Sequence, residues 1–207
     1  LFIAMLIILL NWVNTNGQWL LDNVFVRAAN EALKAGTTGG LGKGDYLTML
    51  YAHFFRNVNW MVVIVKLLLV LRIFKWLGVR GAIFIFPLLS LGGYAFASIT
   101  ATLLVVRWVK TLENGTDYSL MNTIRGALYL ITSREEKYKA KAAIDTVFVR
   151  VGDVLSALTV FLGSAYLAFK LENYAQLNVI GAALWLLMAV LIVREHRKIS
   201  AAKPAVP

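Results

Sequence analysis

Four polar or charged residues, Lys110, Glu113, Asn114 and Asp117, stand three or four positions apart in a strongly apolar part of the chain. This spacing places their side chains on one face of an α-helix. Lys110 can pair with Glu113 or Asn114 in a stripe buried against a neighbouring helix, or the four side chains can line a cavity that binds an ionic solute. Gly115 would let the helix bend or unwind, as helices do near the solute sites of transporters. Both interpretations remain open at this point.

Further charges follow in the same half of the chain. Arg125 has no acidic residue close to it in sequence, so its guanidinium needs a partner from another helix, or an anion such as a carboxylate or phosphate. Arg150 and Asp153 are expected to pair with each other, and the opening of this pair during gating is the alternative. Near the start, the polar residues 14–18 and Asp22 predict either a solute site and water-filled cavity or interhelical hydrogen bonds.

The composition indicates what must surround these charges. The chain has 207 residues, of which 59% are hydrophobic and 15% are charged, and its mean hydropathy is +0.70. Soluble domains rarely contain so few polar residues. Several apolar runs approach the roughly 20 residues needed to cross a bilayer. Because a charge at the centre of a membrane helix costs about 2.5–3.5 kcal/mol, it persists mainly where it faces a cavity or a partner.

We therefore predict an all-α, polytopic membrane protein in a lipid bilayer. The six expected transmembrane helices span about residues 1–26, 46–71, 82–97, 102–129, 146–169 and 177–193. Residues 133–145 are expected to form a cytoplasmic amphipathic helix, and 194–207 a basic cytoplasmic tail. Most Lys and Arg residues then fall on the side that holds both ends, which should be the cytoplasmic side. This loop bias explains the net charge of +10, so we expect no nucleic-acid partner.

The sequence gives little reason to expect catalysis or a bound cofactor. It contains no cysteine, and His53 has no second ligand at metal-binding spacing. The glycine-rich residues 36–44 lack two of the residues that a phosphate-binding loop requires. No Ser/His/Asp set or carboxylate pair is arranged for hydrolysis. We expect a protein that is not an enzyme and has no resident metal.

Residues 107–114 (RWVKTLEN), 116–120 (TDYSL) and 122–125 (NTIR) resemble the ATP/ADP carrier family, the NTP/NDP exchange transporters of the major facilitator superfamily. Residues 132–145 and 150–153 (RVGD) extend the resemblance, which is strongest over about 107–157. Asp117, Arg150 and Asp153 make the chain most similar to the uncharacterised bacterial members, since the nucleotide-carrying members tend to have Lys at the position of Asp117. The resemblance implies the C-terminal six-helix half of such a transporter, in a bacterial inner membrane. The N-terminal half would come from a longer polypeptide or a partner chain.

The resemblance also implies roles for individual residues. The chain would be half of a secondary transporter that moves a nucleotide or another small organic anion by alternating access. The expected solute-binding residues are Asp22, Lys110, Asn114, Asp117, Asn122 and Arg125, and the expected gating or salt-bridge residues are Glu113, Arg150 and Asp153. The alternative is a transporter-derived sensor or scaffold subunit without transport activity. A transporter should hold its charges in a water-accessible cavity, whereas a scaffold should have them paired and closed.

Overall fold

The computed structural model describes residues 2–128 and 144–202. Every regular element within these residues is a helix and none is a strand, which confirms the all-α prediction. Continuous apolar runs favour this outcome, because a helix satisfies its backbone hydrogen bonds within one segment of chain.

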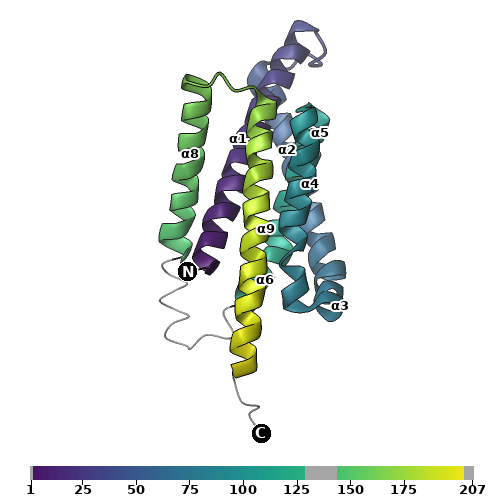
Figure 1. Ribbon diagram of the computed structural model, residues 1–207. Coiled ribbons are helices and arrows are strands. Elements are labelled where there is room, and N and C mark those ends of the chain that lie inside the picture. Colours follow the sequence, from purple (N-terminus) through teal and green to yellow (C-terminus); the bar gives the residue numbers. More distant parts are fainter. Residues whose placement is uncertain (1, 129–143, 203–207) are drawn as a thin grey trace.

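The described residues form six helical segments that alternate in direction along the bundle (Figure 1). The segments are α1 (Phe2–Lys34); α2 (Lys43–Ile64) with the π-helical η1 (Val65–Leu69) and α3 (Val70–Ala82); α4 (Ile85–Ile99); α5 (Leu103–Thr116) with the π-helical η2 (Asp117–Met121) and α6 (Asn122–Leu128); the π-helical η4 (Ile144–Phe148) with α8 (Val149–Ala165); and α9 (Leu171–Ala202). The first described residues and the end of α9 lie at the same end of the bundle.

The helix ends differ from the predicted bounds where polar residues continue a helix. α1 runs past residue 26 to Lys34 and stops where Gly36 adopts a left-handed conformation, with φ of 67°. α9 begins before residue 177 and continues as far as Ala202, so the start of the basic tail is helical. The amphipathic helix predicted for 133–145 lies almost wholly outside the described residues, as does the end of the tail.

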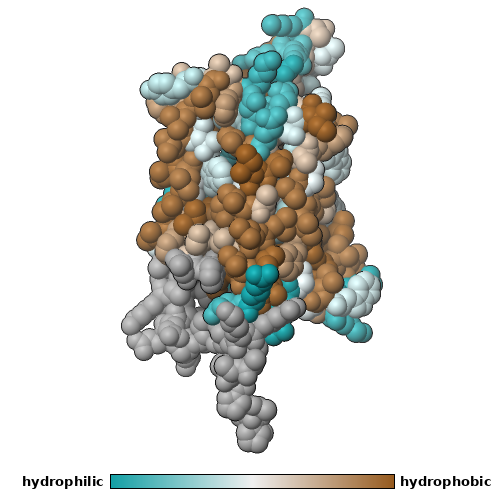
Figure 2. Space-filling model, in the orientation of Figure 1, coloured by the Kyte–Doolittle hydropathy of each residue, from teal (hydrophilic) through white to brown (hydrophobic). Residues whose placement is uncertain are grey.

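Within residues 2–128 and 144–202, two helices are long and apolar enough to cross a membrane, Thr146–Ala165 and Leu171–Glu195. Only 17% of the most apolar window of Thr146–Ala165 is buried in the structure. Figure 2 shows the result on one face, where apolar residues cover the middle of the bundle and hydrophilic ones gather at its two ends. An apolar surface this broad requires an apolar surrounding or a partner.

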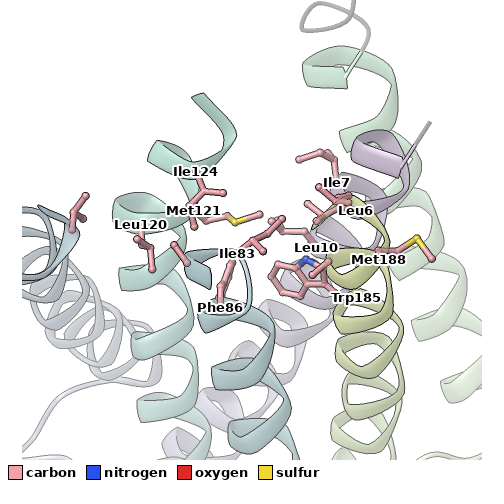
Figure 3. Close-up of a cluster of buried hydrophobic side chains, with 14 of the residues drawn as sticks. Leu6, Ile7, Leu10, Ile83, Phe86, Leu120, Met121, Ile124, Trp185 and Met188 are labelled. Atoms are coloured by element: carbon pink, nitrogen blue, oxygen red, sulfur yellow. The ribbon is translucent and has the colours of Figure 1, made fainter. Parts of the chain in front are cut away.

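α1 lies at the centre of the bundle, in contact with α2, α5, α8 and α9. One apolar cluster joins α1, α4, α9 and the η2–α6 segment near the end that holds both termini (Figure 3). Phe86 and Trp185 meet there edge to face, with ring centroids 4.7 Å apart. A second cluster surrounds Leu20 and Phe54. Most polar side chains of α1 lie between Asn11 and Asp22, the same stretch of α1 that contributes Val13, Leu20 and Leu21 to the second cluster.

Candidate functional site

Lys110 is the centre of a buried polar network between α1, α4 and α5. Its Nζ donates hydrogen bonds to Glu113 Oε2 at 2.8 Å, to the backbone oxygen of Asn14 at 2.8 Å and to Asn14 Oδ1. The hydroxyl of Tyr94 donates to the same Glu113 oxygen at 2.6 Å. The Lys110 and Glu113 side chains are 1% and 0% exposed. All three ammonium hydrogens therefore have acceptors, and the pair is closed to solvent.

Gly17 on α1 makes room for this network. A Cβ atom at this position would lie 1.8 Å from the Tyr94 hydroxyl oxygen and 3.3 Å from Glu113 Oε2. The missing side chain thus lets the tyrosine and the carboxylate reach the backbone of α1. Small residues commonly allow this kind of close approach between membrane helices.

Asp117 and Arg125 form a second ion pair within the fourth segment, with Arg125 Nη2 donating to Asp117 Oδ1 at 3.0 Å. The η2 π-helix makes this pairing possible. In an uninterrupted α-helix, residues eight apart differ in direction by about 80°, whereas residues seven apart differ by about 20°. One extra residue in a π-helical turn restores the closer alignment. The π-turn therefore returns Arg125 to the polar face of Lys110 and Asp117.

Some buried polar atoms on the face of α5 and α6 have no hydrogen-bond partner among the described residues. Glu113 Oε1, Asn114 Oδ1 and Arg125 Nε are buried atoms without a hydrogen-bond partner among the described residues. Most buried polar atoms in proteins do have such a partner. These three atoms leave hydrogen-bonding capacity for water or a ligand beside the Asp117–Arg125 pair. Arg125 is also the more accessible cation, since its side chain is 26% exposed.

Asp153 joins α8 to α1. Its Oδ1 accepts hydrogen bonds from Asn11 Nδ2 at 2.6 Å and from Thr15 Oγ1 at 2.9 Å. Its Oδ2 lies 3.1 Å from Arg150 Nη1, which is the pairing that the three-residue spacing indicates. Gly152 allows the two helices to meet here, because its Cβ would lie 2.8 Å from both Asn11 Cβ and Ile8 O. Asp153 is thus held from both helices, while Arg150 is 79% exposed.

Asp22 connects α1 to α2 without a cationic partner in its hydrogen bonds. Its Oδ1 accepts from Gln18 Nε2 at 2.9 Å and from the Tyr51 hydroxyl at 2.6 Å. Asn122 is exposed at the start of α6. The structure therefore brings together Lys110, Glu113, Asp117 and Arg125 on one helical segment, and it places Asp22 and Asp153 at two separate contacts of α1.

A partly exposed polar stripe runs along α1. Asn11, Thr15, Gln18 and Asp22 are spaced by four, three and four residues, which places them on one helix face. All four are half-buried. Asn11 and Thr15 donate to Asp153, while Asp22 accepts from Tyr51 and from Gln18 within the stripe. Such a stripe is unfavourable against lipid tails, because each polar group would lose its hydration there. It fits a surface that faces water or another protein segment.

This arrangement holds its charges in pairs that an ionic solute or a change of conformation could exchange. The site contains three ion pairs, and each joins one cation to one carboxylate, so each pair is neutral. The pairs are Lys110–Glu113, Asp117–Arg125 and Arg150–Asp153. A solute with a carboxylate or phosphate would meet Arg125 beside Asp117, which already accepts a hydrogen bond from Arg125 Nη2. No cluster of three or more metal-binding side chains occurs in the part of the chain that the structure describes.

Several network residues could not be identified from the sequence. Tyr94 and Asn178 lie in expected helices that are otherwise almost wholly apolar, and Tyr51 lies in one where the charged Arg56 and Lys66 are the more conspicuous residues. Asn178 Oδ1 accepts a hydrogen bond from Asn16 Nδ2 at 2.7 Å and ties α9 to α1. A single polar residue in an apolar helix was the only available signal, and that signal does not identify its partner.

Comparison of the chain with known protein families, with curated proteins and with solved structures finds no match.

Proposed function

We propose that this chain is one six-helix half of a secondary transporter that moves a nucleotide or another organic anion across a bilayer by alternating access. The resemblance of residues 107–125 to the ATP/ADP carrier family supports this proposal. So does the arrangement of six antiparallel helical segments, which is half of the common twelve-helix plan. In this proposal all six segments cross the membrane, and the end that holds both termini faces the cytoplasm.

The observation that carries the proposal is the polar stripe of α1, with its contacts to Asp153 and Tyr51. The stripe is half-buried and lies on a bundle whose surface is apolar along its middle. It would face the second half of the transporter across a water-filled path. Arg125 would then meet the anion before Lys110 does, because Arg125 is the more exposed of these two cations. Lys110 would follow only after its pair with Glu113 opens.

One observation favours a second function, that of a transporter-derived scaffold or sensor subunit. Lys110 and Glu113 are buried, paired and closed to solvent, and Asp117 is paired with Arg125. A fixed network of this kind needs no solute, and it would hold α1, α4 and α5 in one arrangement. The scaffold would use the α1 stripe to bind a neighbouring subunit rather than to line a path.

Binding of anions by the purified full-length protein in lipid nanodiscs separates these two functions. The midpoint of thermal unfolding is measured with nucleotides and with small organic anions. The transporter predicts a rise with at least one anion, and this rise should be lost in Arg125→Gln. Arg27→Gln is the matched control, since Arg27 also pairs with an acid, Glu31, but lies at the far end of α1. It should retain the rise.

The outcomes favour different functions. A rise with ATP or ADP that Arg125→Gln abolishes supports nucleotide transport, and a rise with another anion changes the solute only. A folded protein that responds to no anion supports the scaffold. A rise that both variants retain would remove Arg125 from the binding site.

A further inference from the structure

The outward face of α3 combines basic and apolar side chains. Leu71, Arg72, Lys75 and Trp76 fall within an arc of about 140° around this helix. All four are exposed, and Leu71 and Trp76 are 76% and 77% exposed. The opposite face holds Ile73 and Phe74, which pack against the apolar cluster that joins α1, α4 and α9. α3 is therefore fixed to the bundle on one side and has no cover on the other within the described residues.

The two kinds of side chain alternate closely on this face. Leu71 and Lys75 are four residues apart, as are Arg72 and Trp76, so each basic residue follows or precedes an apolar one on the same row of the helix. Such a pattern does not suit water alone, because it exposes a large indole ring and a leucine. It does not suit the membrane interior either, because two cations would be buried there. It suits the boundary between headgroups and acyl chains, where Trp is enriched and Lys and Arg reach phosphate groups.

The position of α3 in the bundle agrees with this boundary. α3 lies at the end of the bundle where α1 begins and α9 ends (Figure 1). Lys66, which is exposed on η1 about one turn before α3, adds a third positive charge nearer the apolar middle of the bundle. The chain as a whole carries a net charge of +10. Anionic lipids attract basic segments at the surface of the membrane.

We propose that the α3 face formed by Leu71, Arg72, Lys75 and Trp76 is a docking surface for anionic phospholipid headgroups. Arg72 and Lys75 bind the headgroup phosphates, and Leu71 and Trp76 insert beside the first methylenes of the acyl chains. The partner is an anionic bilayer surface rather than a free phosphate ion, because the apolar side chains alternate with the cations and a soluble anion would leave them uncovered. This surface serves a transporter and a scaffold equally well.

Lipid titration of the purified full-length protein tests the proposal. Affinity for phosphatidylglycerol and for phosphatidylcholine is measured by native mass spectrometry in detergent. The wild type should prefer phosphatidylglycerol. Arg72→Gln/Lys75→Gln should weaken phosphatidylglycerol binding about 25-fold, at about five-fold for each charge. Lys34→Gln/Lys43→Gln is the matched control, since it removes two exposed charges at the opposite end of the bundle, and it should leave the preference unchanged.

Two results would overturn the proposal. One is an equal loss in both double variants, or no preference for the anionic lipid in the wild type. The other is thermal stabilisation by inorganic phosphate that disappears in Arg72→Gln/Lys75→Gln, which would indicate a site for a soluble anion.

A spectroscopic measurement checks the depth of α3 and does not depend on affinity. The chain has no cysteine, so a single Leu71→Cys variant can carry one spin label in vesicles that contain phosphatidylglycerol. The label should collide with dissolved oxygen more often than with a water-soluble nickel complex, as at the headgroup boundary. A label that collides mainly with the nickel complex would show that α3 stands in water and would contradict the proposal.

Discussion

The residue that most constrains the polar network is a glycine. Gly17 lies where any Cβ would enter the Tyr94 hydroxyl, so the contact between α1 and α4 depends on its missing side chain. The ion pair of Lys110 and Glu113 lies directly beside this contact and shares the carboxylate that Tyr94 binds. Two features that are separate in sequence, a small residue in one helix and a charge pair in another, thus form a single packed unit.

Gly17→Ala should therefore destabilise the protein by about 1–3 kcal/mol, because the added methyl group forces Tyr94 or α1 to move. Gly92→Ala is the control, since Gly92 lies in α4 and a Cβ there meets no atom within 4 Å. Unfolding by a denaturing detergent measures both variants. An equal loss of stability in the two would show that the close approach at Gly17 contributes nothing.

The buried pair gives a second prediction. Lys110→Met leaves the Glu113 carboxylate buried without its cation, which typically costs about 3–5 kcal/mol. Lys110→Met/Glu113→Gln should recover much of that loss, because both charges are then absent. Arg150→Gln should change stability far less, since Arg150 is exposed. The same unfolding assay applies. A double variant as unstable as Lys110→Met alone would mean that the charges are not coupled.

At the scale of the element, α1 contacts α2, α5, α8 and α9 through polar as well as apolar side chains. α8 reaches it at Gly152, where the Asn11–Asp153 hydrogen bond forms, and α9 reaches it through Asn16 and Asn178. These hydrogen bonds fix the rotation of each helix, which apolar packing alone specifies less sharply.

Gly152→Val should push α8 away from α1, because the nearest obstacles to its side chain include the backbone oxygen of Ile8. The separation would break the Asn11–Asp153 bond and expose the backbone of α8. Hydrogen–deuterium exchange in nanodiscs should then become faster in α8 and stay unchanged in α4. Gly126→Val, at a position with no atom near the added Cβ, should leave α8 as it is. Unchanged exchange in Gly152→Val would contradict the close contact.

Part of this arrangement could be predicted from the sequence. The three- and four-residue spacing placed Lys110, Glu113 and Asp117 on one face, and the spacing of Arg150 and Asp153 indicated their pair. The partner of Arg125 could not be predicted, because Asp117 aligns with it only through the π-turn of η2, and a π-turn has no clear signature in residue types. Tyr94 could not be predicted for a similar reason, since its partner depends on how α4 lies against α5.

At the scale of the whole molecule, the apolar surface and the hydrophilic ends together define an orientation. The loop after α1 and the turn between α8 and α9 lie at one end, and α3 lies at the other with both termini. Two helices in the described part of the chain are long and apolar enough to cross a membrane. Among the other segments, α4 is apolar but only 15 residues long, whereas α1, α2 and α5 contain charged or polar residues.

The six-span proposal predicts a definite labelling pattern in intact cells. Single cysteines at Leu41 and Lys170 should react with a membrane-impermeant maleimide from outside, because both lie at the proposed non-cytoplasmic end. A cysteine at Lys75 should react only after the membrane is permeabilised. If only Thr146–Ala165 and Leu171–Glu195 cross the membrane, cysteines at positions 41 and 75 would react from the same side.

The contrast in exposure between the ion pairs has a consequence for ionic strength. At 0.15 M salt the Debye length is about 8 Å, so mobile ions weaken exposed charge pairs strongly and buried pairs much less. The Arg150–Asp153 pair is open to these ions, whereas the Lys110–Glu113 pair is sealed from them. Rising salt should therefore weaken the Arg150–Asp153 pair within α8 first and leave the Lys110–Glu113 pair intact, while the hydrogen bonds from Asn11 and Thr15 to Asp153 continue to hold α8 against α1.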